Sequence, residues 1–304
     1  MLQRYDPRNA DIRYWVDGVL RHRDEPGISP FDSVVQGGDA VWEGLRVYDG
    51  GIYGLGEHLA RLRRSARALG FERVPADADI VAAVRATLEA NDMRDGVHVR
   101  LTLTRGVKVT SGMDPRLNQA GCTLIVLAEF KPPVYDTGGL SLVTSSVRRP
   151  GPDVLDPKIH HNNLINSILA KMEANLAGAD DAMMLDGRGF VAETNATHLF
   201  AVTGGGLVTP RAVACPEGIT RDTVLRLAPD QGLPVQVRDV SQVELYTADE
   251  VFCTGTMGEI AGVVAIDGRP IGDGTVGPVT ARLARTYRQH AREHAQRLWA
   301  DSSV

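Results

Sequence analysis

One lysine stands out in this sequence as a candidate nucleophile. Lys158 lies in the irregular segment 155–163 (LDPKIHHNN), where Pro157 stiffens the backbone just ahead of a stretch with helical periodicity. Functional side chains are often carried on such loops. An amine that forms a Schiff base must be available in its neutral form, which requires partial desolvation or nearby positive charge. The position of Lys158 makes it the leading candidate for amine chemistry.

The other lysines have simpler interpretations. The chain contains 29 arginines but only four lysines. Lys171 lies in a predicted helix, Lys108 in a polar loop, and Lys131 beside the expected interdomain segment. A solvated surface amine is the expected state of all three.

An acidic residue follows further along the chain. Glu193 stands at the end of an apolar strand in the segment 189–200 (GFVAETNATHLF). An acid in this position is commonly an exposed strand end. The alternative is a carboxylate that keeps a heteroaromatic nitrogen protonated, the role an acid plays beside the pyridinium of pyridoxal phosphate (PLP). The residue alone leaves both interpretations open.

Backbone N–H groups that could bind an anion are expected in two places. The segment 216–222 (PEGITRD) places a glycine before a helix that opens at Thr220. Helix N-termini bind anions, although plain N-capping explains the same residues. The loop 254–258 (TGTMG) follows a strand and could add donors. Arg61 could neutralise a phosphate, but it is also one of many arginines on helix faces.

Metal chemistry is not expected. His160 and His161 are adjacent, but no acidic ligand stands at metal-site spacing. The cysteines, Cys122, Cys215 and Cys253, are far apart in apolar stretches and form no zinc motif. This distribution predicts reduced, mostly buried thiols.

Composition limits the classes of protein to consider. The 304 residues, 43% hydrophobic and 5% aromatic, suffice for one large or two ordinary domains, which excludes a disordered chain or a disulfide miniprotein. The 33 basic and 38 acidic residues give a net charge of -5 without a long block of either sign. Neither a nucleic acid nor an anionic membrane is therefore expected as a partner. Residues 1–14 lack the apolar core of a signal peptide, and the longest apolar run, 122–128, is too short to span a membrane, so we expect a cytoplasmic protein.

The helices and strands expected to position these residues indicate an α+β chain. Period-two alternation over 97–104 puts His98, Arg100 and Thr102 on one strand face and apolar residues on the other. Hairpins are expected around 17–18 and 49–51, helices over 57–69, 78–91, 162–177, from 220 and over 278–299, and strands over 140–146 and 250–253.

A boundary is expected at 130–139, where two prolines and two glycines interrupt the strand pattern. This segment is the predicted interdomain linker. It separates a small N-terminal domain over 1–129 from a larger C-terminal domain over 140–304, with the active site expected between them.

Taken in order, these segments resemble the class IV (fold type IV) PLP-dependent aminotransferases, most closely the branched-chain aminotransferase-like branch. The similarity runs through nearly the whole chain, from 41–48 (VWEGLRVY) and 57–62 (EHLARL) to 267–269 (DGR) and 277–280 (GPVT). It implies a small N-terminal α/β domain, a larger C-terminal PLP-binding domain, and at least a homodimer, because active sites of this family draw residues from the neighbouring subunit.

The resemblance also implies a role for each candidate residue. Lys158 matches the catalytic Schiff-base lysine, and Glu193 matches the carboxylate on the pyridine nitrogen. Residues that match the phosphate site are Arg61, Ile219, Thr220 and Thr256. Residues that match the substrate site are Trp42, Gly44, Arg46, His98, Arg100, Gly255 and Met257.

Three departures from the family pattern affect the expected substrate. Asn163, assigned here to cofactor binding, stands where the branched-chain enzymes usually carry Tyr. Trp42 replaces a pocket Phe, and Gly37 aligns with a pocket Tyr. The strand pair His98/Arg100 replaces the usual Tyr/Arg.

The expected function is ping-pong transfer of an amino group from a branched-chain L-amino acid to 2-oxoglutarate. The main alternative is a D-amino-acid or (R)-selective amine transaminase with pyruvate as acceptor. An aminodeoxychorismate lyase and a catalytically idle homologue are the remaining alternatives. In each enzymatic case the partners are small amino and 2-oxo acids or amines.

Overall fold

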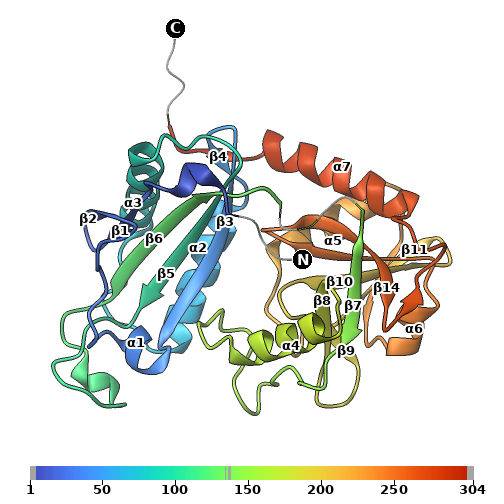
Figure 1. Cartoon of the computed structure of the whole chain (residues 1–304), viewed down its shortest axis with the longest axis horizontal. Helices are drawn as coiled ribbons and strands as arrows, with labels where there is room; N and C mark the ends of the chain where they lie inside the picture. Colours follow the sequence, from blue (N-terminus) through green and yellow to red (C-terminus); the bar gives the residue numbers. More distant parts are fainter. Residues whose placement is uncertain (1–4, 134, 136–137, 300–304) are drawn as a thin grey trace, which may run out of the picture. The chain divides into compact units, whose positions relative to one another are not determined.

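The computed structural model describes residues 5–133, 135 and 138–299, and these form two compact units. Of the described residues, unit 1 contains 133–158 and 164–290. Unit 2 contains 5–132, 159–163 and 291–299. Both units combine helices with a large sheet (Figure 1), which confirms the predicted α+β class.

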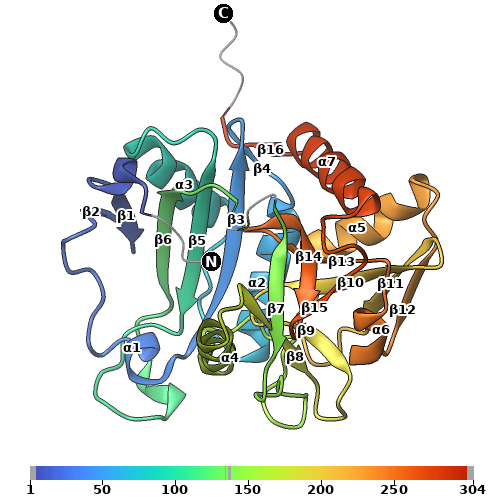
Figure 2. The ribbon, with the colours of Figure 1, turned by 45° about the vertical axis from the view of Figure 1, so that its right-hand side comes forward.

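Unit 2 is built on a seven-stranded antiparallel sheet in the order β16-β4-β3-β5-β6-β1-β2. The strands are β1 (Arg13–Val16), β2 (Val19–His22), β3 (Ala40–Tyr48), β4 (Gly51–Ile52), β5 (Val97–Thr104), β6 (Thr123–Phe130) and β16 (Gln296–Arg297). Helices α2 (Leu55–Ala68) and α3 (Asp77–Ala90) cover one face (Figure 2), and α1 (Ser33–Gly37) precedes β3. Two 3-10 turns complete the unit, η1 (Pro7–Asn9) and η2 (Pro115–Leu117).

Alternation along β5 separates the core of unit 2 from a polar face. Val97, Val99 and Leu101 are fully buried in the cluster that also contains the apolar residues of α2 and α3. His98 and Arg100 therefore lie on the opposite face of the sheet, as predicted. This alternation decides which side chains of the strand are available for binding.

Unit 1 is built on a nine-stranded mixed sheet in the order β12-β11-β10-β13-β14-β7-β8-β9, with β15 paired to β14. Its strands are β7 (Leu140–Thr144), β8 (Asp181–Leu185), β9 (Val191–Thr194), β10 (His198–Thr203), β11 (Gly206–Pro210), β12 (Val235–Arg238), β13 (Glu250–Gly255), β14 (Glu259–Ile266) and β15 (Arg269–Pro270). Its helices are α4 (Ile165–Leu176), α5 (Ile219–Asp230), α6 (Gln242–Tyr246) and most of α7 (Pro278–Glu293).

Most predicted elements are confirmed, with two corrections at helix ends. The helix predicted over 162–177 begins only at Ile165, because residues 160–162 pair with the start of β3 instead. The helix predicted over 278–299 ends at Glu293, because Gln296 and Arg297 form β16 against β4.

The division into units differs from the predicted domain boundaries in the same two places. Residues 159–163 and 291–299 belong to unit 2, although the sequence placed both in the C-terminal domain. Residues 134, 136 and 137 of the predicted linker lie outside the described residues.

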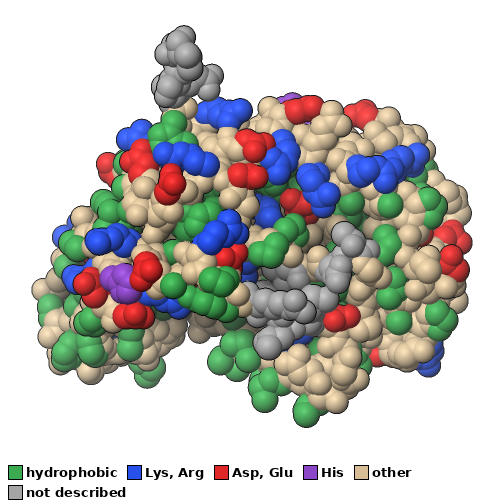
Figure 3. All heavy atoms as spheres, turned by 45° about the horizontal axis from the view of Figure 1, so that its top comes forward, with side chains coloured by type: hydrophobic (Ala, Val, Ile, Leu, Met, Phe, Trp, Pro, Cys, Tyr) green, Lys and Arg blue, Asp and Glu red, His purple; other side chains and the backbone are tan. Residues whose placement is uncertain are grey.

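Charged side chains of both signs are mixed on the surface of the described residues. On the face shown in Figure 3, basic and acidic side chains are interspersed over the described residues. No helix in the described part of the chain combines the length and apolar character needed to cross a membrane.

The last described segment contributes to the core of unit 2, which gives a first testable prediction. Leu298 is buried in that core. We expect Leu298→Ala to lower the free energy of unfolding by about 2–4 kcal/mol, because it leaves a cavity in a packed site. Urea denaturation of the purified protein measures this. Met113→Ala, at a methionine that is 98% exposed, is the control and should change stability by no more than about 0.5 kcal/mol. Equal effects of the two substitutions would contradict the role assigned to Leu298.

Candidate functional site

The carboxylate of Glu193 lies near the buried end of β9. All four residues of β9 are buried, and the chain returns into β10 through a turn in which the hydroxyls of Thr194 and Thr197 are 2.7 Å apart. The backbone N–H of Thr197 also donates to Thr194 Oγ1. Only 4% of Glu193 is exposed, so the interpretation as an exposed strand end is wrong.

Basic side chains surround the buried charge of Glu193. Arg149 forms an ion pair with it, and Arg149 Nη1 also donates to Ser167 Oγ at 3.0 Å. His198 Nε2 lies 3.9 Å from Glu193 Oε2 and 2.9 Å from the carbonyl oxygen of Pro216. Because a carbonyl oxygen only accepts, this nitrogen of His198 carries the proton. These side chains offset the negative charge of Glu193. A carboxylate that is buried away from water needs such compensation to stay ionised.

Cys215 forms a cluster with Glu193 and His198. Their ligand-type atoms lie within 4.8 Å of one another, which is close enough for a metal site. Burial, reinforced by the charge of Glu193, raises the pKa of the Cys215 thiol to about 12. Without a metal ion, the thiol therefore stays protonated at neutral pH. Arg149 already forms an ion pair with the carboxylate of Glu193. The cluster is therefore a poor site for a cation.

Lys158 lies in the same neighbourhood of unit 1. Its charge acts on the Cys215 thiol, and its Nζ donates to the carbonyl oxygen of Ala212 and lies 3.8 Å from Glu217 Oε1. The backbone N–H of Lys158 donates to Asp156 Oδ1 at 2.9 Å, which fixes the start of the side chain. Since 40% of the side chain is exposed, the amine can be reached by a ligand.

The N-terminus of α5 offers donors for an anion. Its N-cap is Gly218, which provides no side-chain hydrogen bond to the first turn, so Ile219 and Thr220 present helix-end N–H groups. A Cβ on Gly218 would come within 2.5 Å of His198 Cε1. The glycine therefore lets the start of α5 approach the side chain that lies beside Glu193.

The loop between β13 and β14 lies beside the turn that follows Glu193. A Cβ on Gly255 would meet Thr197 Cγ2 at 3.1 Å, so the loop and the turn are in close contact. Thr256 and Met257, the next residues, are half-buried. The structure thus connects the predicted residues of unit 1, from Lys158 to the 255–257 loop, through Thr197, His198 and Cys215.

The predicted substrate residues of unit 2 lie together on one face of its sheet. Gly44 is paired with Arg100, and Arg46 with His98, across β3 and β5. The guanidinium of Arg100 lies 3.6 Å above the ring of Trp42. A Cβ on Gly44 would come within 3.2 Å of His98 Nε2, so the glycine leaves the space over this face open.

His98 is neutral in this environment. Burial, together with the positive charges of Lys131, Arg100 and Arg46, lowers its pKa to about 3. Burial also lowers the pKa of Arg100 to about 10, which leaves it charged, with support from Glu43. His98 Nε2 is buried and has no hydrogen-bond partner among the described residues. A buried polar atom of this kind is suited to a ligand that supplies its partner.

Two further predicted cofactor residues belong to unit 2. Arg61 on α2 forms two hydrogen bonds with the buried carboxylate of Glu43, at 2.9 and 2.6 Å. Asn163 Nδ2 donates to the carbonyl oxygen of Gly38 at 3.3 Å, and its backbone N–H donates to His161 Nδ1. Contact of either residue with a cofactor stays a prediction.

Several residues that were not predicted from the sequence contact the predicted ones. They are Arg149, His198 and Cys215 around Glu193, and Glu43, His58 and His160 around Arg61. A signal existed for Glu43, because Val41, Glu43, Leu45 and Val47 alternate on the core-facing side of β3. An acid at an apolar position of a strand indicates a buried partner of opposite charge.

Two of the solvated-lysine expectations are wrong. Lys108 is only 8% exposed and donates to the carbonyl oxygen of Gly112 at 2.5 Å. Lys171 donates to the carbonyl oxygen of Asp180 and lies 3.4 Å from Asp181 Oδ1. Nearby carbonyl and carboxylate oxygens bind both amines. The spacing of residues in the sequence does not reveal these contacts.

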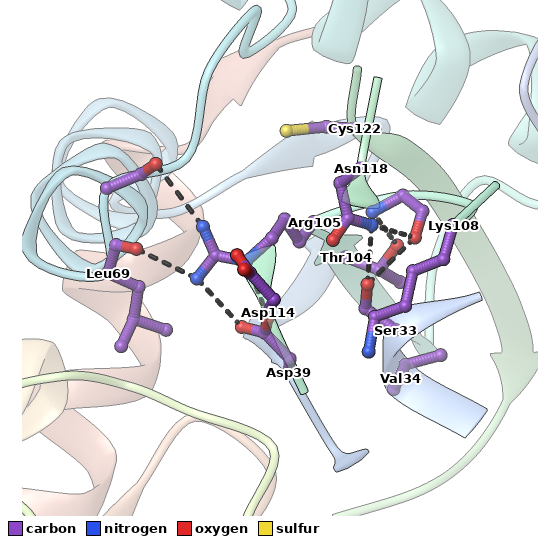
Figure 4. A network of polar contacts seen from close by, with 12 residues as sticks. Ser33, Val34, Asp39, Leu69, Thr104, Arg105, Lys108, Asp114, Asn118 and Cys122 are labelled. Atoms are coloured by element: carbon purple, nitrogen blue, oxygen red, sulfur yellow. Dashed lines mark hydrogen bonds and ion pairs between the residues drawn. The ribbon is translucent and has the colours of Figure 1, made fainter. Parts of the chain in front are cut away.

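A hollow of about 540 Å³ in unit 2 lies apart from these residues, around Arg73, Arg105 and Arg116. Figure 4 shows that Arg105 is bonded to Asp39 and to the carbonyl oxygen of Leu69. The other two arginines are likewise bonded, to the Gln119 carbonyl and to the Asp114 carboxylate. Because its cations are already paired, the hollow is not the candidate site.

The donor set of unit 1 fits PLP. An accessible primary amine suits its aldehyde, a buried and ion-paired carboxylate suits its ring nitrogen, and a helix N-terminus without a side-chain cap suits its phosphate. These groups are together suited to hold PLP.

Comparison with known proteins identifies the family. The model of the family "Amino-transferase class IV" matches residues 40–266. Branched-chain-amino-acid aminotransferase-like protein 2 of Arabidopsis thaliana is 55% identical over 284 residues, which are 93% of this chain and 51% of that protein. The chain thus spans about half the length of the Arabidopsis relatives that it matches. A putative branched-chain-amino-acid aminotransferase of Methanocaldococcus jannaschii is 38% identical over 91% of this chain and 96% of its own length.

Solved structures agree with this result. A branched-chain amino acid aminotransferase from T.th., crystallised with pyridoxamine 5'-phosphate, matches with a TM-score of 0.87 and 35% identity, over 93% of this chain and 95% of that one. The chain therefore belongs to the class IV aminotransferase family and shares the fold of the solved branched-chain aminotransferase.

The depressed pKa of His98 generates a prediction for pH dependence. In the unfolded chain His98 takes up a proton below its ordinary pKa of 6.5, whereas in the folded chain it does so only near 3. Protonation therefore favours the unfolded state, and His98 makes stability fall as the pH falls from 6.5 toward 3. Between pH 6.5 and 4.5 the wild type should lose about 2 kcal/mol more stability than His98→Gln, which cannot titrate. Urea denaturation across this range measures the difference, and parallel profiles for the two proteins would contradict a neutral, buried His98.

Proposed function

We propose that this protein is a PLP-dependent transaminase that moves an amino group from a branched-chain L-amino acid to 2-oxoglutarate by a ping-pong mechanism. The observation that carries the proposal is the grouping of Lys158, Glu193 and the N-terminus of α5 within unit 1. The bound cofactor supplies an electron sink for the carbanion formed at the substrate's α-carbon.

The residues of unit 1 are proposed to have different roles in the reaction. Lys158 Nζ would accept the α-proton of the amino substrate as a base and would later donate it as an acid. Glu193 holds a proton on the ring nitrogen, and Arg149 and His198 keep Glu193 ionised by compensating its charge. The N–H groups of Ile219 and Thr220, with Thr256, would bind the phosphate.

The polar sheet face of unit 2 is proposed to bind the substrate. Trp42 offers an apolar wall, while Arg46 and Arg100 offer positive charge to a carboxylate. This combination suits a reaction with one apolar and one dicarboxylic substrate. The T.th. relative has been crystallised with 4-methylvaleric acid and with N-(5'-phosphopyridoxyl)-L-glutamate, which supports the same pair of substrate types. Gly255 and Met257 of unit 1 are separately proposed as substrate contacts.

A second candidate keeps the cofactor but changes the substrate to a D-amino acid or an (R)-amine, with pyruvate as acceptor. His98 favours it, because a neutral imidazole replaces the Tyr usual in branched-chain enzymes and alters recognition of the carboxylate. A D-alanine aminotransferase of Bacillus licheniformis is 32% identical over 88% of this chain and 93% of its own length.

We also propose that the protein is at least a homodimer. The outer face of α4 carries an apolar stripe without charged side chains: Ile165, Ile168, Leu169, Met172 and Leu176 are all exposed. Lys171 and Glu173 of the same helix are bonded within unit 1. An exposed apolar stripe of this size supports association with a second copy.

Cofactor attachment is the first test of the proposed function. We expect the protein to be yellow after reconstitution with PLP, and borohydride followed by peptide mass mapping should place a phosphopyridoxyl group on Lys158. Lys158→Ala should lose the adduct and more than about 1,000-fold of turnover, because it removes the proton-transferring amine. Lys171→Ala is the control and should retain both. A wild-type protein that takes up no PLP, or a phosphopyridoxyl group on another lysine, would refute the assignment.

A half-reaction panel distinguishes the two substrate classes. The PLP-loaded protein is mixed separately with L-leucine, D-alanine and (R)-1-phenylethylamine, and loss of its visible absorption is followed. We expect L-leucine to react fastest, because its apolar side chain suits the Trp42 wall. Absence of a response to L-leucine with a response to either of the others would reverse the order of the candidates.

A further inference from the structure

Strand β13 of unit 1 carries a row of side chains toward the N-termini of two helices. Glu250, Phe252 and Thr254 alternate with residues of the hydrophobic core, so they share the opposite face of the strand. Glu250, at one end of the row, accepts hydrogen bonds from the backbone N–H groups of Val279 and Thr280 at 2.9 and 2.7 Å. The first turn of α7 is thus satisfied by a buried carboxylate of the chain itself.

The N-terminus of α5 has no comparable cap. Its N-cap is Gly218, which offers no side-chain acceptor. Asp222, the acid in its first turn, lies 3.4 Å from Arg221 Nη1. Gly218 and Thr220 are both buried, which limits the access of water to this helix end. The first N–H groups of a helix have no partner within the helix, and with the helix dipole they attract an anion.

Thr254, at the other end of the row on β13, has a buried hydroxyl without a partner. The residue is 0% exposed, and its Oγ1 makes no hydrogen bond within the described part of the chain. Thr209, which is equally buried in the same sheet, donates from its Oγ1 to the carbonyl oxygen of Leu199 at 2.7 Å. Because a buried hydroxyl without a hydrogen bond is costly, Thr254 indicates a ligand atom that accepts from it.

Strand pairing places the side chain of Thr254 close to the start of α5. Thr254 lies directly opposite His198 in the antiparallel pair of β13 and β10, so the two side chains are neighbours on one face. The next pair on this face, Phe200 and Phe252, stacks at 5.0 Å. A Cβ on Gly218 would come within 2.5 Å of His198 Cε1, and α5 packs against β13. The hydroxyl of Thr254 and the first turn of α5 therefore lie beside the same imidazole.

The groups gathered at this helix end favour an anion such as a phosphate. They are hydrogen-bond donors: the N–H groups of α5 and the hydroxyls of Thr220 and Thr254. Thr220 Oγ1 also lies 3.4 Å from the hydroxyl of Tyr287 on α7. Phosphate oxygens can accept several such hydrogen bonds at once, whereas a cation would meet the positive end of the helix dipole.

We propose that Thr254 is a phosphate-binding residue, whose hydroxyl donates to the anion held at the N-terminus of α5. The proposal rests on the proposed function and deepens it, because the anion is then the phosphate of PLP. The family resemblance gave this role to Ile219, Thr220 and Thr256 in unit 1, and not to Thr254. All the groups on which the proposal depends belong to unit 1.

The test compares PLP with pyridoxal, which lacks the phosphate, on the whole chain freed of cofactor. In fluorescence titrations Thr254→Val, which replaces the hydroxyl by a methyl group, should bind PLP about 10-fold more weakly than the wild type and pyridoxal with less than about a twofold change. Thr254→Ser keeps the hydroxyl and should bind PLP within about threefold of the wild type. Thr209→Val is the matched control, because its hydroxyl serves a backbone carbonyl oxygen, and both affinities should equal those of the wild type.

Unchanged PLP affinity in Thr254→Val would overturn the proposal, because the hydroxyl would then serve a buried water or no ligand at all. Equal weakening of PLP and pyridoxal would also overturn it, since a merely structural role affects both ligands. If Thr254→Val does not fold, Thr254→Ala is subjected to the same comparison.

Inorganic phosphate separates the failure of this proposal from that of the proposed function. Phosphate should raise the thermal unfolding midpoint of the cofactor-free wild type, because it binds the folded state, and should raise that of Thr254→Val less. A wild type that responds to phosphate through Thr254 but binds no PLP would refute the proposed function and support the role of Thr254. A wild type that binds neither ligand, or an equal response of the two proteins to phosphate, would overturn the role of Thr254.

Discussion

The site of unit 1 depends on the ion pair between Arg149 and Glu193. A carboxylate at this depth stays ionised only if protein groups replace the water that it has lost. Arg149 supplies the charge, and the partners of Arg149 reach beyond it to Ser167 on α4 and to the carbonyl oxygen of Ala214. A network of this kind is costly when one member is missing, because the partner remains buried and uncompensated. The electrostatics of Glu193 are therefore linked to the packing of α4 against the sheet.

The same physical requirement recurs in unit 2 at Glu43. In both units a buried acid is held by an arginine and approached by a histidine. The two acids differ in what they serve: Glu193 is proposed to meet the cofactor directly, whereas Glu43 contacts only protein. The contribution of a buried carboxylate in this fold therefore depends on the groups that its arginine can contact.

The sequence predicted the elements better than it predicted their contacts. β5 was predicted with its full bounds, because strict alternation over eight residues leaves one interpretation, and the same alternation placed His98 and Arg100 on the polar face. Lys158 and Glu193 were singled out as candidates because each stands where chain geometry changes. The partners of Glu193 were missed, since Arg149 and His198 reach it through tertiary packing that spacing does not encode. For the same reason Lys108 and Lys171 were taken for solvated amines, although nearby carbonyl oxygens bind both. His160 was considered only as a metal ligand, because its contact with Glu43 joins residues more than a hundred positions apart.

The late position of β16 in the chain has a consequence for the order of folding. β4 lies at an edge of the sheet of unit 2 until Gln296 and Arg297 arrive to pair with it. During synthesis these residues leave the ribosome only after all of unit 1 has been made. Unpaired strand edges invite association with other chains. The brevity of β4, two residues long, limits this exposure, so a nascent chain can carry an unfinished N-terminal sheet through the synthesis of unit 1 with little risk of aggregation.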